Sequence, residues 1–190
     1  MGLVRRLMYS GSCFFELAKG VILVAVAVTV IHLFVATIFI VDGSSMKPNF
    51  ATGQLIVVNR WTYLFGHPER GDVVVLRFPG DPEHKKYVKR LLGLPGETIE
   101  IKNDHLYVNN IPLAEPYLKP NEVTSVIIPG KSRWTLGAND YFLVGDNRPN
   151  SNDSRTWDQA DKRFLIGKAV FILWPPKDAG IVPKETYDLN

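Results

Sequence analysis

An uninterrupted apolar stretch covers residues 20–41 and contains no Asp, Glu, Lys or Arg. As one helix it would extend roughly 33 Å at a rise of ~1.5 Å per residue, which exceeds the ~30 Å hydrocarbon layer of a bilayer. His32 is the one titratable side chain in the stretch, and it can stay neutral near pH 7. The pattern predicts a single transmembrane helix, with a lipid bilayer as a partner.

Charges on either side of the stretch predict its orientation. Arg5, Arg6 and Lys19 precede it, whereas Asp42 follows it, and basic residues collect on the cytoplasmic side of membrane helices. The competing interpretation is a cleaved secretory signal, for which the stretch is too long. We therefore expect a cytoplasmic segment at 1–19, an uncleaved anchor at 20–41 and an extracytoplasmic domain at 42–190.

Short β-branched or aromatic runs, separated by turn residues, follow the stretch and predict a mainly β domain. The hairpin signal at 98–108 is the clearest, because apolar and polar residues alternate on both sides of Asn103 and Asp104. A late apolar run is too short to span a membrane and predicts a buried strand. Strands are expected at 54–58, 72–78, 98–102, 105–108, 141–144 and 164–174.

Composition excludes several kinds of function. The formal net charge is +3, and basic residues are mixed with acidic ones, so no nucleic-acid surface stands out. Cys13 is the one cysteine and precedes the apolar stretch, so the outer domain has no disulfide. The histidines lie far apart without the spacing of metal ligands. We expect one domain without metal or cofactor.

A hydroxyl-rich turn at 42–48 directly follows the apolar stretch, and Ser45 within it is a candidate nucleophile. A serine hydroxyl reacts poorly unless a neighbouring base removes its proton. His67, His84 and His105 are candidate bases, each without a carboxylate that the sequence can place beside it. Lys89 is the other candidate.

Lys89 has the more favourable surroundings. In a strand over 87–91, Tyr87, Lys89 and Leu91 share one face, so apolar groups would flank the amine. Such burial lowers the pKa of a lysine, which makes it usable as a base near neutral pH. The polar segment 145–155, which directly follows a predicted strand, is either part of the same site or a surface loop.

Three segments together resemble the type I signal peptidases: GSSMKP at 43–48, YVKR at 87–90 leading into GLPG at 93–96, and GDNR at 145–148 running to DSR at 153–155. The sequence GDVV at 71–74 matches a further stretch of that family. The resemblance covers nearly the whole chain, and it implies a mostly antiparallel β domain behind a single membrane helix.

The resemblance also implies a role for each matching residue. Ser45 corresponds to the nucleophile, Lys89 to the general base and Ser151 to the serine that orients the lysine. Arg90, Asp153 and Arg155 correspond to charged residues that support the site. Met46 and Tyr87 flank Ser45 and Lys89. For each of them, a place in the wall of a substrate pocket and a place in the core are both open interpretations. The substrates would be secretory preproteins, bound as extended peptides and cut after small residues at positions −1 and −3.

Some positions depart from the family pattern. Asn49 replaces the usual threonine, Pro149 replaces an aspartate, and Gly43 lacks the serine side chain that helps to hold the oxyanion in some members. Asn152, Asp153 and Ser154 form a glycosylation pattern inside the proposed site, which argues against the endoplasmic-reticulum lumen. The expected location is a plasma membrane of bacterial type, with an organellar inner membrane as the alternative.

Two rival functions stay open. One is a non-catalytic, membrane-tethered β domain that binds extended peptides, which requires a groove but not a reactive pair. The other is a self-cleaving regulator with the same serine and lysine chemistry. The apolar stretch and the lack of a DNA-binding helical region count against this second rival.

Overall fold

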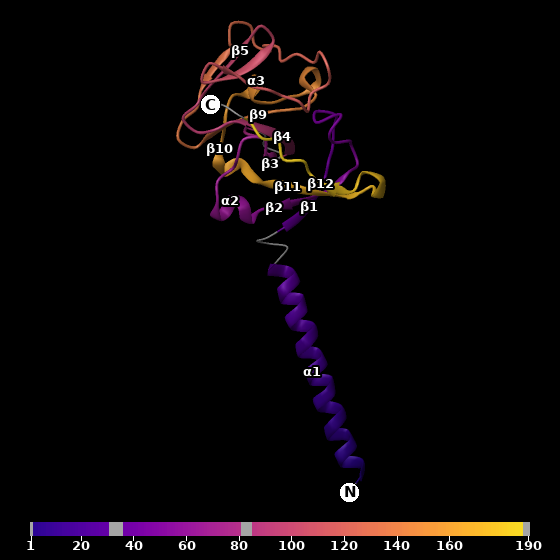
Figure 1. The fold of residues 1–190 in the computed structure, drawn as a ribbon. Helices are drawn as coiled ribbons and strands as arrows, with labels where there is room; N and C mark the ends of the chain where they lie inside the picture. Colours follow the sequence, from indigo (N-terminus) through magenta and orange to yellow (C-terminus); the bar gives the residue numbers. More distant parts are fainter. Residues whose placement is uncertain (1, 31–35, 81–84, 188–190) are drawn as a thin grey trace.

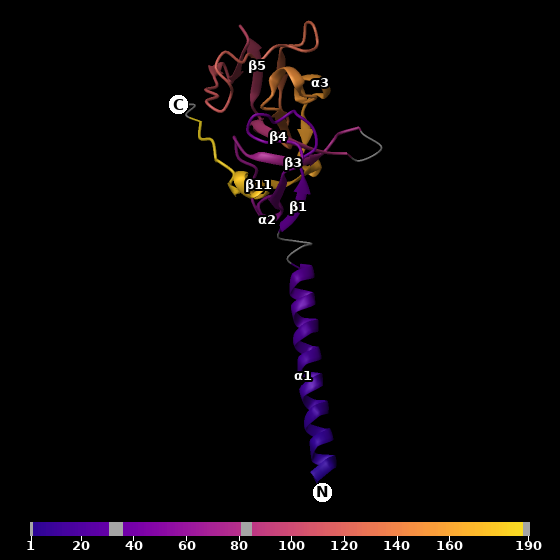
Figure 2. The ribbon, with the colours of Figure 1, turned by 90° about the vertical axis from the view of Figure 1, so that its right-hand side faces the viewer.

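The computed structural model describes residues 2–30, 36–80 and 85–187, with side chains from Phe15 onward. A straight helix, α1 (Gly2–Val30), extends away from a compact β domain (Figures 1 and 2). Its apolar side chains from Val21 to Val28 are exposed. Among the described residues, no helix is both long enough and apolar enough to cross a membrane.

The predicted single helix over 20–41 is wrong at its C-terminal end. α1 ends at Val30, and residues 36–40 form strand β1 (Ala36–Ile40), which pairs antiparallel with β2 (Leu55–Asn59). The sequence of β1 is rich in Thr, Ile and Phe, which favour strands, and apolar content alone does not distinguish a buried strand from a helix. The expected boundary at residues 19 and 20 falls inside α1, and His32 lies outside the described residues.

The β domain contains two sheets in which every strand pairing is antiparallel. The larger sheet has the order β1-β2-β11-β3-β4-β9-β10, with β12 on β11, and the smaller one the order β7-β6-β5-β8. The remaining strands of the larger sheet are β3 (Val73–Arg77), β4 (Lys86–Gly93), β9 (Asp140–Val144), β10 (Ala160–Asp161), β11 (Leu165–Trp174) and β12 (Gly180–Ile181). The smaller sheet contains β5 (Thr98–Lys102), β6 (His105–Val108), β7 (Ile111–Pro112) and β8 (Arg133–Thr135). The prediction of a mainly antiparallel β domain is confirmed.

The strands agree closely with the hydrophobic pattern. The hairpin β5-β6 turns at Asn103 and Asp104, whose φ angles are +48° and +63°. Asn and Asp tolerate this left-handed region better than other residues with side chains. The late apolar run forms β11, an interior strand of the larger sheet between β2 and β3.

Both faces of the larger sheet are covered, because alternate residues of a strand point to opposite sides. Val73 and Val75 pack with Met46 and Phe50 on one face, whereas Val74 and Leu76 pack on the other. Two short helices complete this domain, α2 (Trp61–Phe65) after β2 and α3 (Ser154–Trp157) after β9. The loop that carries Ser45, between β1 and β2, meets β4 and the segment after β9 on this scaffold.

Candidate active site

Ser45 lies in the loop between β1 and β2, directly after the first strand. The amide of Phe50 donates to the carbonyl of Met46 at 2.9 Å, and the amide of Gly53 donates to the carbonyl of Val41 at 2.8 Å. Gly43 has a φ of +99°, a conformation that strains any residue with a side chain. These contacts fix the backbone around the Ser45 hydroxyl.

Lys89 lies in β4 opposite Val74, and its Nζ is 2.7 Å from Ser45 Oγ. The residue is only 3% exposed. Burial lowers the pKa of the Lys89 amine from its ordinary 10.5 to about 8, since the buried cation loses hydration, while Asp153 and Asp146 oppose the shift. The two groups that sequence reasoning paired are therefore in contact, 44 residues apart in the chain.

The lowered pKa of Lys89 predicts that the rate of the reaction depends on pH. Only the neutral amine can accept a proton, so kcat/KM should rise with pH and level off above pH 8. Between pH 6 and pH 8, the neutral fraction and hence kcat/KM should increase about fiftyfold. Initial rates on a peptide substrate at low concentration measure this profile. A flat profile over that range would contradict a lysine base.

The segment after β9 is hydrogen-bonded to the loop that carries Ser45. The Asn147 amide donates to the Ser45 carbonyl, and its Nδ2 donates to the Ser44 carbonyl, both at 2.9 Å. A Cβ at Gly145 would lie 2.5 Å from the Ser45 carbonyl oxygen and 2.2 Å from Ser151 Oγ. Glycine is thus needed at 145 for the two segments to approach so closely.

Ser151 is buried beside Gly145, but its hydroxyl has no hydrogen-bond partner among the described residues. The expected contact with Lys89 is therefore not present in this structure. The segment that carries Ser151 is nonetheless next to the reactive pair, since Asn150 and Asn152 line the same cavity as Lys89. The orienting role of Ser151 stays a prediction.

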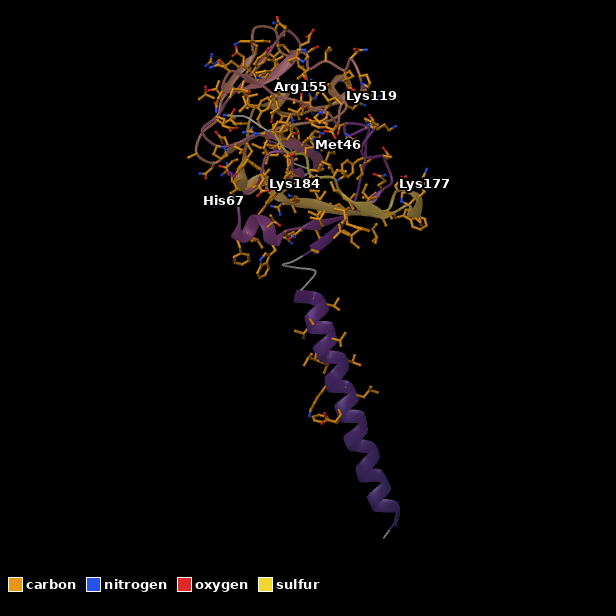
Figure 3. The ribbon with its side chains drawn as sticks, in the orientation of Figure 1. Met46, His67, Lys119, Arg155, Lys177 and Lys184 are labelled. Carbon is orange, nitrogen blue, oxygen red and sulfur yellow. The ribbon has the colours of Figure 1, made fainter. Side chains whose placement is uncertain are left out.

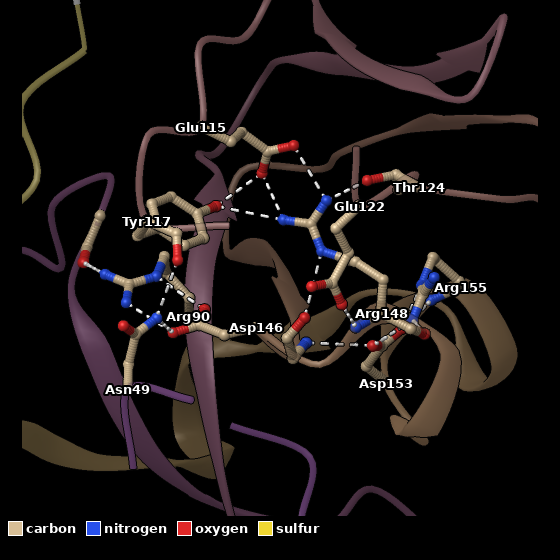
Figure 4. A network of polar contacts seen from close by, with 12 residues as sticks. Asn49, Arg90, Glu115, Tyr117, Glu122, Thr124, Asp146, Arg148, Asp153 and Arg155 are labelled. Atoms are coloured by element: carbon tan, nitrogen blue, oxygen red, sulfur yellow. Dashed lines mark hydrogen bonds and ion pairs between the residues drawn. The ribbon is translucent and has the colours of Figure 1, made fainter. Parts of the chain in front are cut away.

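Arg90, Asp153 and Arg155 take part in two separate buried ion pairs. Arg90 donates from Nε and Nη2 to Asp146 at 2.8 and 2.7 Å. Arg155 donates from Nε and Nη2 to Asp153 at 2.9 and 2.8 Å, and Asp153 also accepts from the Gly145 amide at 3.0 Å. Figure 4 shows both pairs within one polar network. Asp146 is the partner of Arg90 that sequence reasoning did not assign.

A second unassigned part of this network comes from residues 115–124. Arg148 pairs with Glu115 and also donates to the Tyr117 hydroxyl at 3.1 Å, and its amide donates to Glu122 at 3.1 Å (Figure 4). The Arg90 guanidinium lies over the Tyr117 ring, 4.0 Å from its centre. The Tyr117 side chain is buried within this network.

The Arg90–Asp146 pair has a testable energetic role, because both side chains are almost fully buried. Asp146→Asn should lower the free energy of unfolding by about 3–5 kcal/mol, since it leaves the Arg90 charge buried without a counterion. Chemical denaturation measures the change. Glu69→Gln, which breaks an exposed pair with Lys184, is the control and should have a small effect. Equal effects of the two variants would contradict the role of burial.

A cavity of about 210 Å³ opens beside the reactive pair. Residues 41–46 form one wall, residues 87–89 form another, and Asn150 and Asn152 complete it. Met46 lines this cavity and is 2% exposed within the core, so the pocket and core interpretations both stay open. Tyr87 also lines the cavity, with its ring centre 5.1 Å from Lys89 Nζ. The cavity can accommodate a small side chain next to Ser45.

Histidine chemistry has no support in the described part of the chain. His67 follows α2, and His105 begins β6 in the smaller sheet. Neither residue lines the cavity beside Ser45. His84 lies outside the described residues. No group of three His, Cys, Asp or Glu that could hold a metal ion occurs among the residues with described side chains.

Comparison with known proteins identifies the family. A family model described as "Signal peptidase, peptidase S26" matches residues 14–174. The chain belongs to this signal peptidase family. It is 37% identical to a signal peptidase I of Bacillus amyloliquefaciens over 87% of this chain and 88% of that protein. It is also 37% identical to signal peptidase I S of Bacillus subtilis (strain 168), over 84% of this chain and 89% of that one.

A solved signal peptidase I from Enterococcus faecalis V583 is 32% identical and superimposes with a TM-score of 0.46. It covers 54% of this chain and 96% of its own. The assignment to the signal peptidase family rests on the sequence matches, and it makes this chain a serine peptidase.

The structure gives physical reasons for the departures from the signal peptidase pattern. Asn49 donates from Nδ2 to Asp146 at 2.8 Å and to the Tyr117 carbonyl at 3.2 Å, which a threonine could not do with one hydroxyl proton. Pro149 lies in a short 3₁₀ helix (Arg148–Asn150), where its fixed φ is compatible. At Gly43 the positive φ excludes an unstrained serine, so this position cannot readily supply a side-chain donor to an oxyanion.

Proposed function

We propose that this serine peptidase is a membrane-bound endopeptidase that removes signal peptides from secretory preproteins, with Ser45 as nucleophile and Lys89 as general base. The observation that carries the proposal is the 2.7 Å contact between Ser45 Oγ and the buried Nζ of Lys89. The names of the relatives support the substrate class, because each is a signal peptidase I.

The reaction proceeds in two steps. Neutral Lys89 accepts the Ser45 proton as Oγ attacks the scissile carbonyl, and the resulting ammonium then donates the proton to the leaving amine. An ester links Ser45 to the signal peptide. Lys89, neutral again, takes a proton from water as the water oxygen attacks the ester carbonyl, and the resulting ammonium returns this proton to Ser45 Oγ as the ester C–O bond breaks. The backbone amide of Ser45 is the proposed donor to the oxyanion.

The substrate lies as an extended strand between the two walls of the 210 Å³ cavity. Residues 87–89 belong to strand β4 and form one side of this cavity, so the backbone of the substrate can pair with them while alternate side chains point into the cavity. The small volume supports cleavage after small residues, since a large side chain would not fit beside Tyr87 and Met46.

Membrane attachment is proposed through α1 and the residues that follow it. The exposed apolar side chains of α1 have no partner within the described part of the chain, and lipid would cover them. Arg5 and Arg6 favour a cytoplasmic N-terminus, which puts Ser45 on the outer side of a bacterial plasma membrane. Secretory preproteins arrive on that side.

Mass spectrometry of the products from a defined preprotein tests the proposal. The full chain in detergent should release a signal peptide that ends in a small residue, with a second small residue two positions earlier. An intact preprotein under conditions of demonstrated binding would support the non-catalytic peptide binder instead. Cleavage of the chain itself, without cleavage of the preprotein, would support the self-cleaving regulator.

Ser151→Ala tests the proposed orienting role. The Ser151 hydroxyl is buried near Ser45 and Lys89 and has no partner among the described residues, so it is available to contact Lys89 when substrate is bound. We expect kcat to fall about tenfold to a hundredfold while KM changes little, because positioning of a base contributes to the chemical step. Steady-state kinetics measure both constants, and a wild-type kcat would reject the role.

A further inference from the structure

A second cavity, of about 160 Å³, lies between α2 and the beginning of β11, away from Ser45. It is lined by four cationic side chains from three separate parts of the chain. Arg60 precedes α2, Arg77 ends β3, and the 3₁₀ turn before β11 contributes Lys162 and Arg163. The proposed peptidase mechanism uses none of them. We refer to these four residues as the cationic site.

Acidic residues are absent from the described lining of this cavity. Asp161, outside the lining, forms a long ion pair with Arg163, in which Oδ1 lies 3.8 Å from Nε and the Arg163 side chain stays 76% exposed. Lys162 Nζ donates to the Gly66 carbonyl at 3.3 Å. A neutral carbonyl does not compensate the positive charge of Lys162. Four cationic side chains gathered around one cavity would stabilise an anion that enters it. Arginines favour phosphate, which they bind through two parallel hydrogen bonds.

An apolar surface adjoins the cationic site. Leu64 lines the cavity and is 55% exposed, and the neighbouring Trp61 and Phe65 are 49% and 72% exposed. The rings of Trp61 and Phe65 contact each other, with centres 4.5 Å apart. α2 lies at the end of the β domain nearest α1 (Figure 1), and Figure 3 shows aromatic rings that project from this end toward α1. Aromatic side chains next to cations are typical of a protein surface at the lipid headgroups.

We propose that the cationic site binds the phosphate group of an anionic phospholipid, while Leu64 and Phe65 contact the acyl region of the same lipid. The inference rests on the proposed membrane location but not on the cleavage reaction. A free phosphate ion would satisfy the cations alone, whereas a phospholipid also covers the exposed side chains of α2. Such a contact would hold the β domain at a fixed height above the bilayer.

Native mass spectrometry of the full chain, released from neutral detergent micelles, can measure binding of added phosphatidylglycerol. The double variant Arg77→Gln/Arg163→Gln should weaken binding about thirtyfold, because each cation near an anionic lipid contributes roughly a factor of five. The matched control, Lys119→Gln/Arg133→Gln, removes two exposed cations elsewhere in the domain and should change the affinity less than threefold. Equal loss in both double variants would overturn the proposal.

Two further measurements distinguish a phospholipid site from a free-phosphate site and from loss of folding. Arg77→Lys/Arg163→Lys keeps the charges and should restore most of the affinity, and thermal unfolding shows whether each variant stays folded. Inorganic phosphate at millimolar concentration should not displace the lipid; displacement would overturn the lipid assignment in favour of a free-phosphate site. Ser45→Ala should bind phosphatidylglycerol like the wild type, so failure of the peptidase proposal is distinguishable from failure of this one.

Discussion

Lys89→Met should abolish turnover, with kcat reduced by at least about 10⁴-fold. Methionine has nearly the length of lysine and is apolar, so it can fill the same buried position without a basic group. Without the amine at 2.7 Å, no group accepts the Ser45 proton, and a neutral hydroxyl is a poor nucleophile. A general base alone contributes about 10²–10⁴-fold, and loss of one member of a catalytic pair commonly costs more.

Lys89→Met should also change the stability of the fold, and this effect is measured separately from activity. The pKa of Lys89 is lower in the folded protein than in the unfolded chain, so burial of its charged form destabilises the fold below pH 8. Lys89→Met should therefore be more stable than the wild type at pH 7, and the difference should shrink as pH rises toward 10.5. Lys102→Met, at an exposed position in β5, should change neither activity nor stability appreciably. Substantial turnover by Lys89→Met would eliminate the proposed base.

Ser45→Ala should cause a loss of similar size, and the double variant with Lys89→Met should be no less active than either single variant. Residues that act as one unit are strongly non-additive, because removal of either one disables both. A quenched peptide substrate at high enzyme concentration can measure the residual rates. Ser44→Ala is the matched control, since it removes the neighbouring hydroxyl but keeps the backbone contact with Asn147. Additive losses, or equal losses for Ser44 and Ser45, would contradict a coupled pair.

The sequence predicted most of the β domain because period-two alternation and turn residues are local signals. The hairpin around Asn103 and the late strand β11 were found in this way. Lys89 was selected because a strand over 87–91 put it beside Tyr87, and the structure confirms that strand. The resemblance to the signal peptidases then predicted that three separate segments form one site, and the structure brings these segments together.

Long-range partners could not be predicted in the same way. Nothing near Glu115 or Tyr117 in the sequence indicates that they contact Arg148, since the pairing depends on how the 115–124 segment folds over the loop after β9. The end of the apolar stretch was misassigned for a related reason. β1 pairs with β2, which lies outside the stretch, and the apolar content of the stretch does not reveal that partner.

The central claim is that burial next to Ser45 lowers the pKa of Lys89, so that a usable fraction of the amine is neutral near physiological pH. Carbon-13 NMR of protein labelled at the lysine Cε, with the Lys89 signal assigned by its absence in Lys89→Met, measures the titration of this amine directly. The predicted result is a midpoint near pH 8. A midpoint near 10.5, the value of an exposed lysine, would contradict the account.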